Sequence, residues 1–202
     1  SGASVAANYD ELVLENSAHC GMTILSGTSS AGGYRFGDSG DNDIGGVIYD
    51  HSDNSLTLKN NAANSLVIDS TGAVTMPLQP AFHVHPASEQ ADFGSGQVIA
   101  VVWGTERFDL NGDFASNSFT APVTGKYHFD VNIGIDEVNT DNSTNYYYIQ
   151  LTTSNRVYYH LQDIARAGAL DWYLSFSVLA DMDASDTANV QIVKGGSNTS
   201  DT

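Results

Sequence analysis

The sequence predicts an all-β protein, and two observations carry that prediction. Apolar residues recur at every second position in short stretches, which is the period of a strand with one buried face. Gly, Ser, Asn, Asp and Thr fill the segments between these stretches, and no window sustains the period of a helix. With 202 residues and an apolar content of 41%, the chain is long enough for one large or two small folded domains.

The clearest strand signal follows a turn at Pro122 and Gly125. Proline fixes φ and glycine allows positive φ, so this pair predicts a reversal of the chain. After the turn, polar residues alternate with a row of apolar ones, namely Tyr127, Phe129, Val131, Ile133 and Ile135. We therefore expect a long, half-buried strand here.

Residues 119–129 resemble the signature of the complement C1q globular-domain family, a trimeric jelly roll related to tumour necrosis factor. In chain order, further segments are similar to strands of that family, namely 80–82, 98–102, 148–151, 174–179 and 186–193. The resemblance implies a C1q/TNF-like jelly-roll head that assembles as a trimer. The family usually closes with a strand carrying a serine-x-phenylalanine-x-glycine pattern, which residues 197–202 lack. Either the sequence is truncated or this member finishes differently, and a missing strand would leave a sheet edge open.

Before this region, apolar residues come in pairs two positions apart. The pairs are Leu12/Leu14, Met22/Ile24, Tyr34/Phe36, Leu56/Leu58, Leu66/Ile68 and Val74/Met76. Ile48 stands where another pair would fall, so the unit is a short strand plus a turn, repeated about seven times. So few buried side chains per strand cannot offset the entropy of ordering the backbone within one chain. We expect a repetitive trimeric β stalk in which copies wind around a common axis; the alternative is a small meander packed on the second domain.

Part of this stalk resembles a segment that recurs in bacteriophage tail fibres and related phage structural proteins. The residues concerned are 41–56 and 66–74, and residues 11–16 and 23–28 are similar to the segment often found just before it. The resemblance implies a trimeric fibre shaft, placed in the virion and therefore extracellular.

Pro77 and Pro80 mark the domain boundary, because two closely spaced prolines favour an extended connector. The expected organisation is a stalk over residues 1–76, a junction over 77–86 and a jelly-roll head over 87–202, whose first strand begins in the junction near Pro80. The start Ser-Gly-Ala-Ser, without methionine, is typical of a fragment of a longer protein.

His83 and His85 form the first candidate metal site, because they share one face of the expected strand. On a threefold axis, three chains would bring six imidazoles together, which suits an octahedral transition metal. Histidine-x-histidine motifs of this kind occur in some phage fibres. The alternative is a pair of polar residues on an edge strand.

Three acidic loops offer the hard oxygen ligands that calcium needs. They are Asp109/Asn111/Asp113, Asp136/Glu137/Asp141 and Asp181/Asp183/Asp186. Members of the C1q-like family do sometimes bind calcium, but no loop here completes a calcium-binding pattern, and ordinary turn residues are the alternative. No cofactor is otherwise required.

Tyrosines are the candidate ligand contacts. Tyr146 and Tyr148 share one face of an expected strand, and Tyr158 is the third candidate, pointing to the opposite side from Tyr159. Exposed tyrosines suit either stacking on sugar rings or packing between subunits, so both interpretations remain open.

Composition and motifs exclude several functions. The net charge of −17 makes nucleic acid and anionic membranes poor partners. Cys20 is the only cysteine, so an intrachain disulfide is excluded. The sequence contains no glycine-framed serine nucleophile, phosphate loop or His-Glu-x-x-His motif, so we expect no enzyme.

Three functions are compatible with these observations. The first is a tail-fibre tip that recognises a bacterial surface glycan or protein receptor as a homotrimer, with avidity from several heads. The second is a structural trimerisation cap or connector without receptor binding. The third is a depolymerase that cuts host polysaccharide, since any acidic β protein offers pairs of carboxylates.

Overall fold

The structure is a computed structural model and describes residues 12–90, 96–136, 146–163 and 171–195. Within these ranges every regular element is a β-strand, which confirms the all-β prediction. The described ranges contain no helix long and apolar enough to cross a membrane. The chain forms two compact units, Ser1–Leu78 and Gln79–Thr202, which we call the stalk unit and the head unit.

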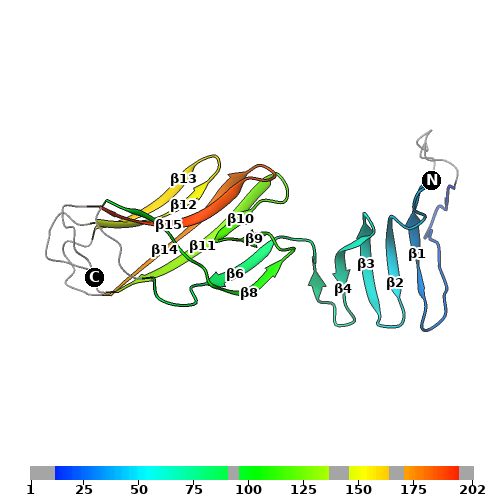
Figure 1. The fold of residues 1–202 in the computed structure, drawn as a ribbon. Helices are drawn as coiled ribbons and strands as arrows, with labels where there is room; N and C mark the ends of the chain where they lie inside the picture. The colour runs from blue at the N-terminus through cyan, green and yellow to red at the C-terminus, as the bar shows by residue number, and fades with distance from the viewer. Residues whose placement is uncertain (1–11, 91–95, 137–145, 164–170, 196–202) are drawn as a thin grey trace. The chain divides into compact units, whose positions relative to one another are not determined.

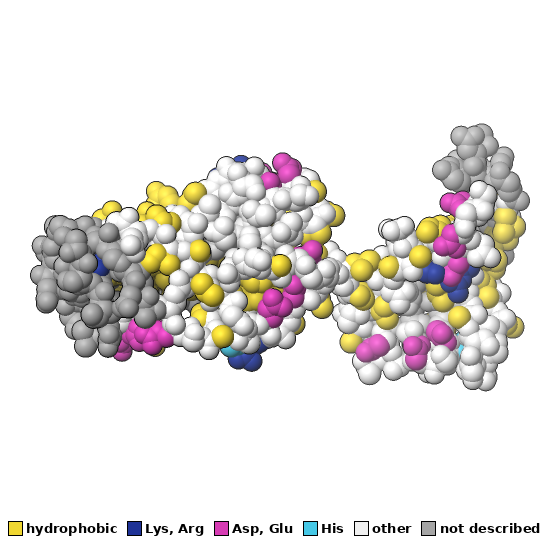
Figure 2. All heavy atoms as spheres, viewed as in Figure 1, with side chains coloured by type: hydrophobic (Ala, Val, Ile, Leu, Met, Phe, Trp, Pro, Cys, Tyr) yellow, Lys and Arg dark blue, Asp and Glu magenta, His cyan; other side chains and the backbone are white. Residues whose placement is uncertain are grey.

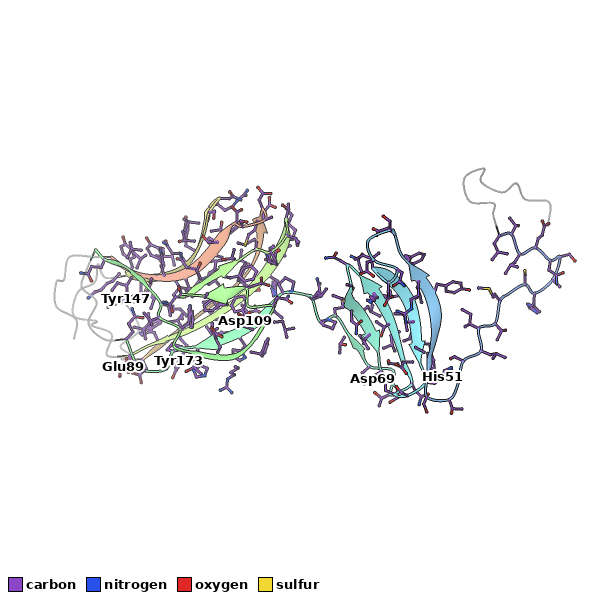
Figure 3. The ribbon with its side chains drawn as sticks, turned by 45° about the vertical axis from the view of Figure 1, so that its right-hand side comes forward. His51, Asp69, Glu89, Asp109, Tyr147 and Tyr173 are labelled. Carbon is purple, nitrogen blue, oxygen red and sulfur yellow. The ribbon has the colours of Figure 1, made fainter. Side chains whose placement is uncertain are left out.

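The stalk unit contains one antiparallel sheet in which neighbours in sequence are neighbours in space (Figure 1). Its strands are β1 (Ala31–Phe36), β2 (Gly45–Asp50), β3 (Ser55–Asn60), β4 (Ala63–Ile68) and β5 (Val74–Thr75). Polar residues make the turns tight. Asn61 and Ala62 both have positive φ between β3 and β4, as a two-residue hairpin turn requires. Asp69 accepts hydrogen bonds from the backbone N–H groups of Thr71 and Ala73 after β4, at the end of the sheet where His51 follows β2 (Figure 3).

The strand register gathers most of the large apolar residues of β1–β5 on one side of this sheet. This apolar face consists of Tyr34, Phe36, Val47, Tyr49, Leu56, Leu58, Leu66, Ile68 and Val74; all of them pair with one another across neighbouring strands except Phe36, which pairs with Gly45. Much of it is open to solvent, since Phe36 is 62% exposed and Val74 is 57% exposed. Apolar side chains are visible on the surface of this unit in Figure 2.

Ile48 is not the apolar member that β2 contributes to this face. It pairs with Thr57 on the opposite side of the sheet, whereas Val47 pairs with Leu58 and Tyr49 with Leu56. The missing pair of the sequence pattern is therefore Val47/Tyr49. Because three apolar residues follow one another in β2, the sequence alone does not indicate which of them share a face.

The opposite, polar face of the stalk sheet carries a small ion-pair network. Arg35 and Lys59 both pair with Gly46 across the strands, and both reach Asp43, at 2.6 and 2.7 Å. Position 46 requires glycine for another reason, because a Cβ there would lie only 2.6 Å from the backbone oxygen of Tyr34. The two cations hold the pKa of the Asp43 carboxyl below its ordinary value, chiefly through the hydrogen bond from Lys59.

The head unit contains a larger antiparallel sheet and two pairs of strands (Figure 1). The sheet has the order β13 (Val157–Asp163), β12 (Tyr146–Thr153), β15 (Thr187–Gly195), β10 (Ser118–Thr120) and β9 (Phe114–Ala115), and β7 (Val98–Ala100) also pairs with β15. The pairs are β11 (Gly125–Ile135) with β14 (Trp172–Met182), and β6 (Ala81–His85) with β8 (Thr105–Leu110).

The head core lies between β11–β14 and the larger sheet. Strand β11 confirms the predicted alternation, since Phe129, Val131, Ile133 and Ile135 are buried and their neighbours are exposed. Tyr147, Ile149 and Leu151 of β12 enter the same cluster. Phe119 of β10, only 2% exposed, contacts the rings of Phe82 and Phe129 at centroid distances of 5.2 and 5.7 Å.

Lys194 is buried on the face of β15 that packs on the head core, opposite Tyr147. Its Nζ lies 5.8 Å from the centre of the Tyr147 ring, a distance at which an ammonium is attracted by the ring face. Burial lowers the pKa of Lys194 and raises the pKa of Tyr147 to about 12, so the Tyr147 phenol remains neutral at physiological pH.

Candidate functional site

The two histidines of the junction lie on one face of β6, as the sequence predicts. Phe82 and Val84 pack against the head core, so His83 and His85 point to the other side of the strand. The His83 ring meets Phe108 edge-on at 6.0 Å, and His85 Nδ1 lies 2.9 Å from the Pro86 carbonyl oxygen. Among the described residues, no group of three or more histidine, cysteine, aspartate or glutamate side chains is placed to hold a metal. A site shared by histidines of several copies stays a prediction.

The first acidic loop forms the turn that connects β8 to β9. The Asp109 carboxylate accepts hydrogen bonds from the N–H groups of Asp113 and Phe114, at 3.2 and 3.0 Å. Asn111 and Gly112 between them have positive φ. Asp109 and Asn111 therefore act as turn residues, which was the alternative to calcium ligands in the sequence prediction.

The third acidic loop is divided between an ion pair and a turn. Asp181 pairs with Lys126 and lies 3.9 Å from Arg156, and these cations, Lys126 above all, lower the pKa of its carboxyl. Asp186 accepts hydrogen bonds from Asn155 and from the N–H of Asp183, at 2.6 and 2.8 Å. The sequence missed the cations because Lys126 is distant from Asp181 along the chain. In the remaining loop, Asp136 follows β11, while Glu137 and Asp141 lie outside the described residues.

The candidate tyrosines separate into two groups. Tyr146 and Tyr148 lie on the outer face of β12, away from Tyr147 in the core. Tyr158 packs against the core, and its hydroxyl lies 3.5 Å from the backbone N of Asp181. Tyr159 takes the outer position instead, because it pairs with Gln150, which shares the face of Tyr146 and Tyr148. It is 69% exposed. Alternation along β13 separates Tyr158 from Tyr159, but only the register shows which of them joins Tyr148.

We call Tyr146, Tyr148 and Tyr159 the tyrosine platform. The rings of Tyr146 and Tyr148 are almost parallel, with an interplanar angle of 10° and centroids 6.2 Å apart. Tyr159 approaches Tyr148 from β13, with centroids 6.0 Å apart and planes tilted by 59°. Three aromatic rings from two neighbouring strands therefore form one continuous surface on the head.

Polar side chains continue the platform along the same face of β12 and β15. Gln150 donates a hydrogen bond to the side-chain oxygen of Gln191 at 2.5 Å, and the Thr152 hydroxyl donates to the same oxygen at 3.1 Å. Gln150 Nε2 also donates to the Thr152 hydroxyl at 3.2 Å, so the Gln150 oxygen and the Gln191 N–H groups are the polar atoms that take no part in these three bonds.

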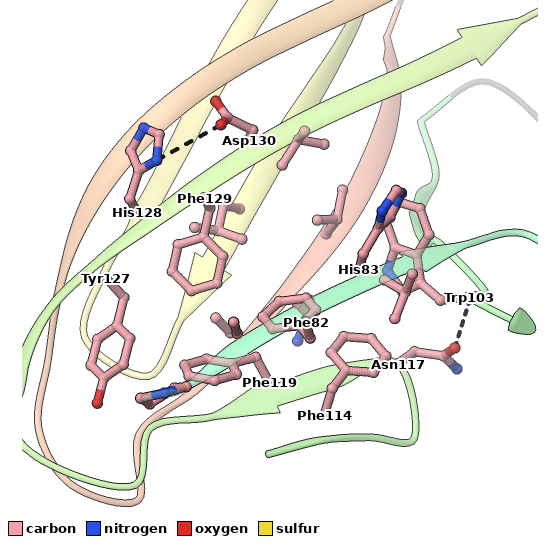
Figure 4. A pocket seen from close by; sticks show the side chains of 18 of the residues that line it. Phe82, His83, Trp103, Phe114, Asn117, Phe119, Tyr127, His128, Phe129 and Asp130 are labelled. Atoms are coloured by element: carbon pink, nitrogen blue, oxygen red, sulfur yellow. Dashed lines mark hydrogen bonds and ion pairs between the residues drawn. The ribbon is translucent and has the colours of Figure 1, made fainter. Parts of the chain in front are cut away.

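The head also has a groove of about 850 Å³ between β6 and β11. The rings of Phe82, Phe119 and Phe129 line it (Figure 4). On its polar side, His128 lies 3.7 Å from Asp130. Among the described strands, β6 pairs only with β8 and β11 only with β14, so each presents one open edge beside this groove.

No family model matches this chain, and no curated protein matches it. The resemblances to tail fibres and to the C1q-like family therefore depend on the residues quoted for them alone.

Proposed function

We propose that this chain is the tip of a bacteriophage tail fibre, which acts as a homotrimer in host-surface recognition and adhesion. In this proposal the stalk unit is a repetitive β shaft, and the head unit is a C1q/TNF-like jelly roll. The observation that carries the proposal is the open apolar face of the stalk sheet.

The apolar face requires a covering layer. Soluble monomers rarely expose contiguous apolar patches larger than a few hundred Å², yet the apolar side chains of this face continue across all strands of the sheet. No second layer of strands is present in the described part of the stalk unit. Identical chains can cover one another by placing these faces around a common axis, and each buried CH₂ group then contributes about 0.8 kcal/mol.

The arrangement of the head strands supports the jelly-roll assignment. The larger sheet and the β11–β14 pair contribute side chains to one core, as two packed sheets do in a sandwich. Among the described strands, β6 and β11 each have one unpaired edge beside the groove. One further strand between them would join β8–β6 and β11–β14 into a single sheet.

Adhesion is the function that such an assembly serves best. Several identical heads on one fibre bind a surface with much greater avidity than one head, even when each contact is weak. The tyrosine platform presents aromatic surface to solvent, which suits a receptor contact.

Two measurements on the purified chain test this proposal. Light scattering is expected to give three times the 21.5 kDa chain mass, and labelled protein is expected to bind host bacteria and to compete with phage adsorption. A monomer would contradict the stalk assignment. A trimer that binds no bacterium susceptible to the phage would contradict adhesion.

The second candidate is a trimerisation cap or connector without receptor binding. It is favoured by the apolar face itself, which explains assembly without any ligand. Replacing the exposed tyrosines of the head would then leave phage adsorption unchanged.

A further inference from the structure

We propose that the tyrosine platform binds the uncharged sugar rings of a host-surface polysaccharide, and that Gly195 sets the orientation of its first ring. This inference rests on the proposed adhesive function and names the ligand class of the head.

Gly195 is the residue opposite Tyr146 on the neighbouring strand β15. A Cβ atom built at Gly195 would overlap the Tyr146 ring, so that ring occupies the space that a side chain at position 195 would fill. Aromatic side chains cover strand glycines in this way across antiparallel pairs. The Tyr146 ring is thus held across β15 and still keeps 40% of its surface exposed.

Tyr148 follows two positions later and has almost the same ring orientation, since the two planes differ by only 10°. Parallel rings on one strand offer faces to successive rings of an extended ligand. Sugar rings have an apolar C–H side that packs against aromatic faces by dispersion, and their edges carry hydroxyl groups. Gln150, Thr152 and Gln191 lie on the same outer face and offer the hydrogen bonds that such hydroxyls need.

The charge of this face selects an uncharged ligand. Apart from the tyrosines, the outward-facing side chains described on β12, β13 and β15 are not ionisable; they are Tyr146, Tyr148, Gln150, Thr152, Val157, Tyr159, Leu161, Asn189, Gln191 and Val193. The register also places an acidic residue, Asp163, opposite Tyr146 at the end of this face. No lysine or arginine stands among them to hold a carboxylate or phosphate. The whole chain carries −17, which repels polyanions. An acidic polysaccharide is therefore a poor ligand for the platform, and a neutral one is a good ligand.

A polysaccharide panel tests the inference on the intact chain. The neutral probes are a glucan, a mannan and a galactan, and the acidic probes are alginate and polysialic acid, each tested by affinity electrophoresis and titration calorimetry. At least one neutral polymer should bind, and its affinity should change little with salt, whereas neither acidic polymer should bind. Binding of an acidic polymer alone, or of no neutral polymer, would overturn the inference.

Two variants link the binding to the platform. Tyr159→Ala removes a ring that is 69% exposed, and Gly195→Ala displaces the Tyr146 ring without removing it. Each should weaken neutral-polymer binding about tenfold or more. Tyr173→Ala, which removes an 85% exposed tyrosine of β14, should have no effect. Light scattering and circular dichroism of each variant check that assembly and fold are retained, and Tyr159→Ala answers the question if Gly195→Ala does not fold.

Adsorption to host cells, measured in parallel, separates this inference from the proposed function. If wild-type protein binds cells and the Tyr159→Ala variant binds them equally well, adhesion stands and the platform is not its site. If wild-type protein binds a neutral polymer but no host cell, the platform binds sugar and the adhesive function is wrong.

Discussion

The stalk unit and the head unit have the same alternation of apolar and polar residues but bury the apolar ones very differently. In β11 of the head, Phe129 and Ile133 are only 7% and 8% exposed. In the stalk, Phe36 and Leu58 lie on the apolar face of the sheet, yet they are 62% and 42% exposed. Alternation therefore shows which face of a strand needs cover, while the cover itself comes from a second layer in the head and, as proposed, from other copies in the stalk.

The largest effect is expected from a charge on the apolar face of the stalk. Leu58→Glu should abolish assembly, because burying an unpaired carboxylate costs several kcal/mol for every copy in the interface. Light scattering should then show the mass of one chain. Since Leu58 is already partly exposed in the single chain, circular dichroism should change little.

Thr75→Glu is the matched control for this change. Thr75 is exposed and lies in the same sheet, paired with Val67 on the face opposite to Leu58. This variant should assemble as the unaltered chain does. If the two variants behave alike, the difference between the two faces of the stalk sheet has no role in assembly.

A cavity in the head core should have the next largest effect. Phe119→Ala removes a ring that is 2% exposed and packed among other aromatic rings, so the head should lose about 3–5 kcal/mol of stability. Denaturant unfolding followed by near-UV circular dichroism measures this loss. Leu179→Ala, at a 62% exposed position of β14, is the control and should stay within about 0.5 kcal/mol of the wild type.

A smaller effect is expected from filling the groove between β6 and β11. An added peptide that alternates valine with serine can pair with both open edges and cover the rings of Phe82 and Phe129. The melting temperature of the head should rise by several degrees, and backbone amides of β6 and β11 should exchange more slowly. A scrambled peptide of the same composition should give neither result, and equal protection of the edge strand β13 would contradict selective binding in the groove.

The smallest effect is expected from the ion pairs on the polar face of the stalk. Because the pKa of Asp43 in the folded chain lies below its ordinary value of 3.8, its contribution to stability is present above that pH and is lost as the pH falls through the folded value. The melting temperature of the stalk unit should therefore decrease as the pH falls below about 4. Asp43→Asn should remove this part of the pH dependence, and an unchanged pH profile would show that the ion pairs with Arg35 and Lys59 contribute nothing.

Features within one strand could be predicted from the sequence, whereas features that depend on two strands could not. The alternation of β11 and the apolar pairs of β1, β3 and β4 follow from side chains that point to opposite faces at successive positions. The prediction was wrong for Leu12/Leu14 and Met22/Ile24, which lie before β1 and outside any strand, because two apolar residues two positions apart do not by themselves supply a partner strand. The apolar face contains Val47 and Tyr49 in place of the expected Ile48, and the tyrosine platform contains Tyr159 in place of Tyr158. Both corrections depend on the register with a neighbouring strand. Register is set by turn geometry, such as the positive φ values of Asn61 and Ala62, which the sequence only suggests.

The candidate metal ligands show the same limit. The spacing of His83 and His85 predicts their shared face, because it is a property of one strand. The partners of Asp181 and Asp186 come from distant segments, so their ion pair and hydrogen bonds are hidden in a linear reading. Gly195 is another example, since its role depends entirely on Tyr146 of the neighbouring strand.

The sequential order of the stalk strands has a consequence for how such a chain can change in length. Each strand of β1–β5 pairs only with its neighbours along the chain, so a deletion disturbs local pairings and leaves the others intact. Because successive strands run in opposite directions, removing one strand reverses the direction in which the chain leaves the sheet, whereas removing two restores it. Insertions and deletions in this unit should thus be inherited in steps of whole hairpins, so that sheets of different lengths can keep the same apolar face.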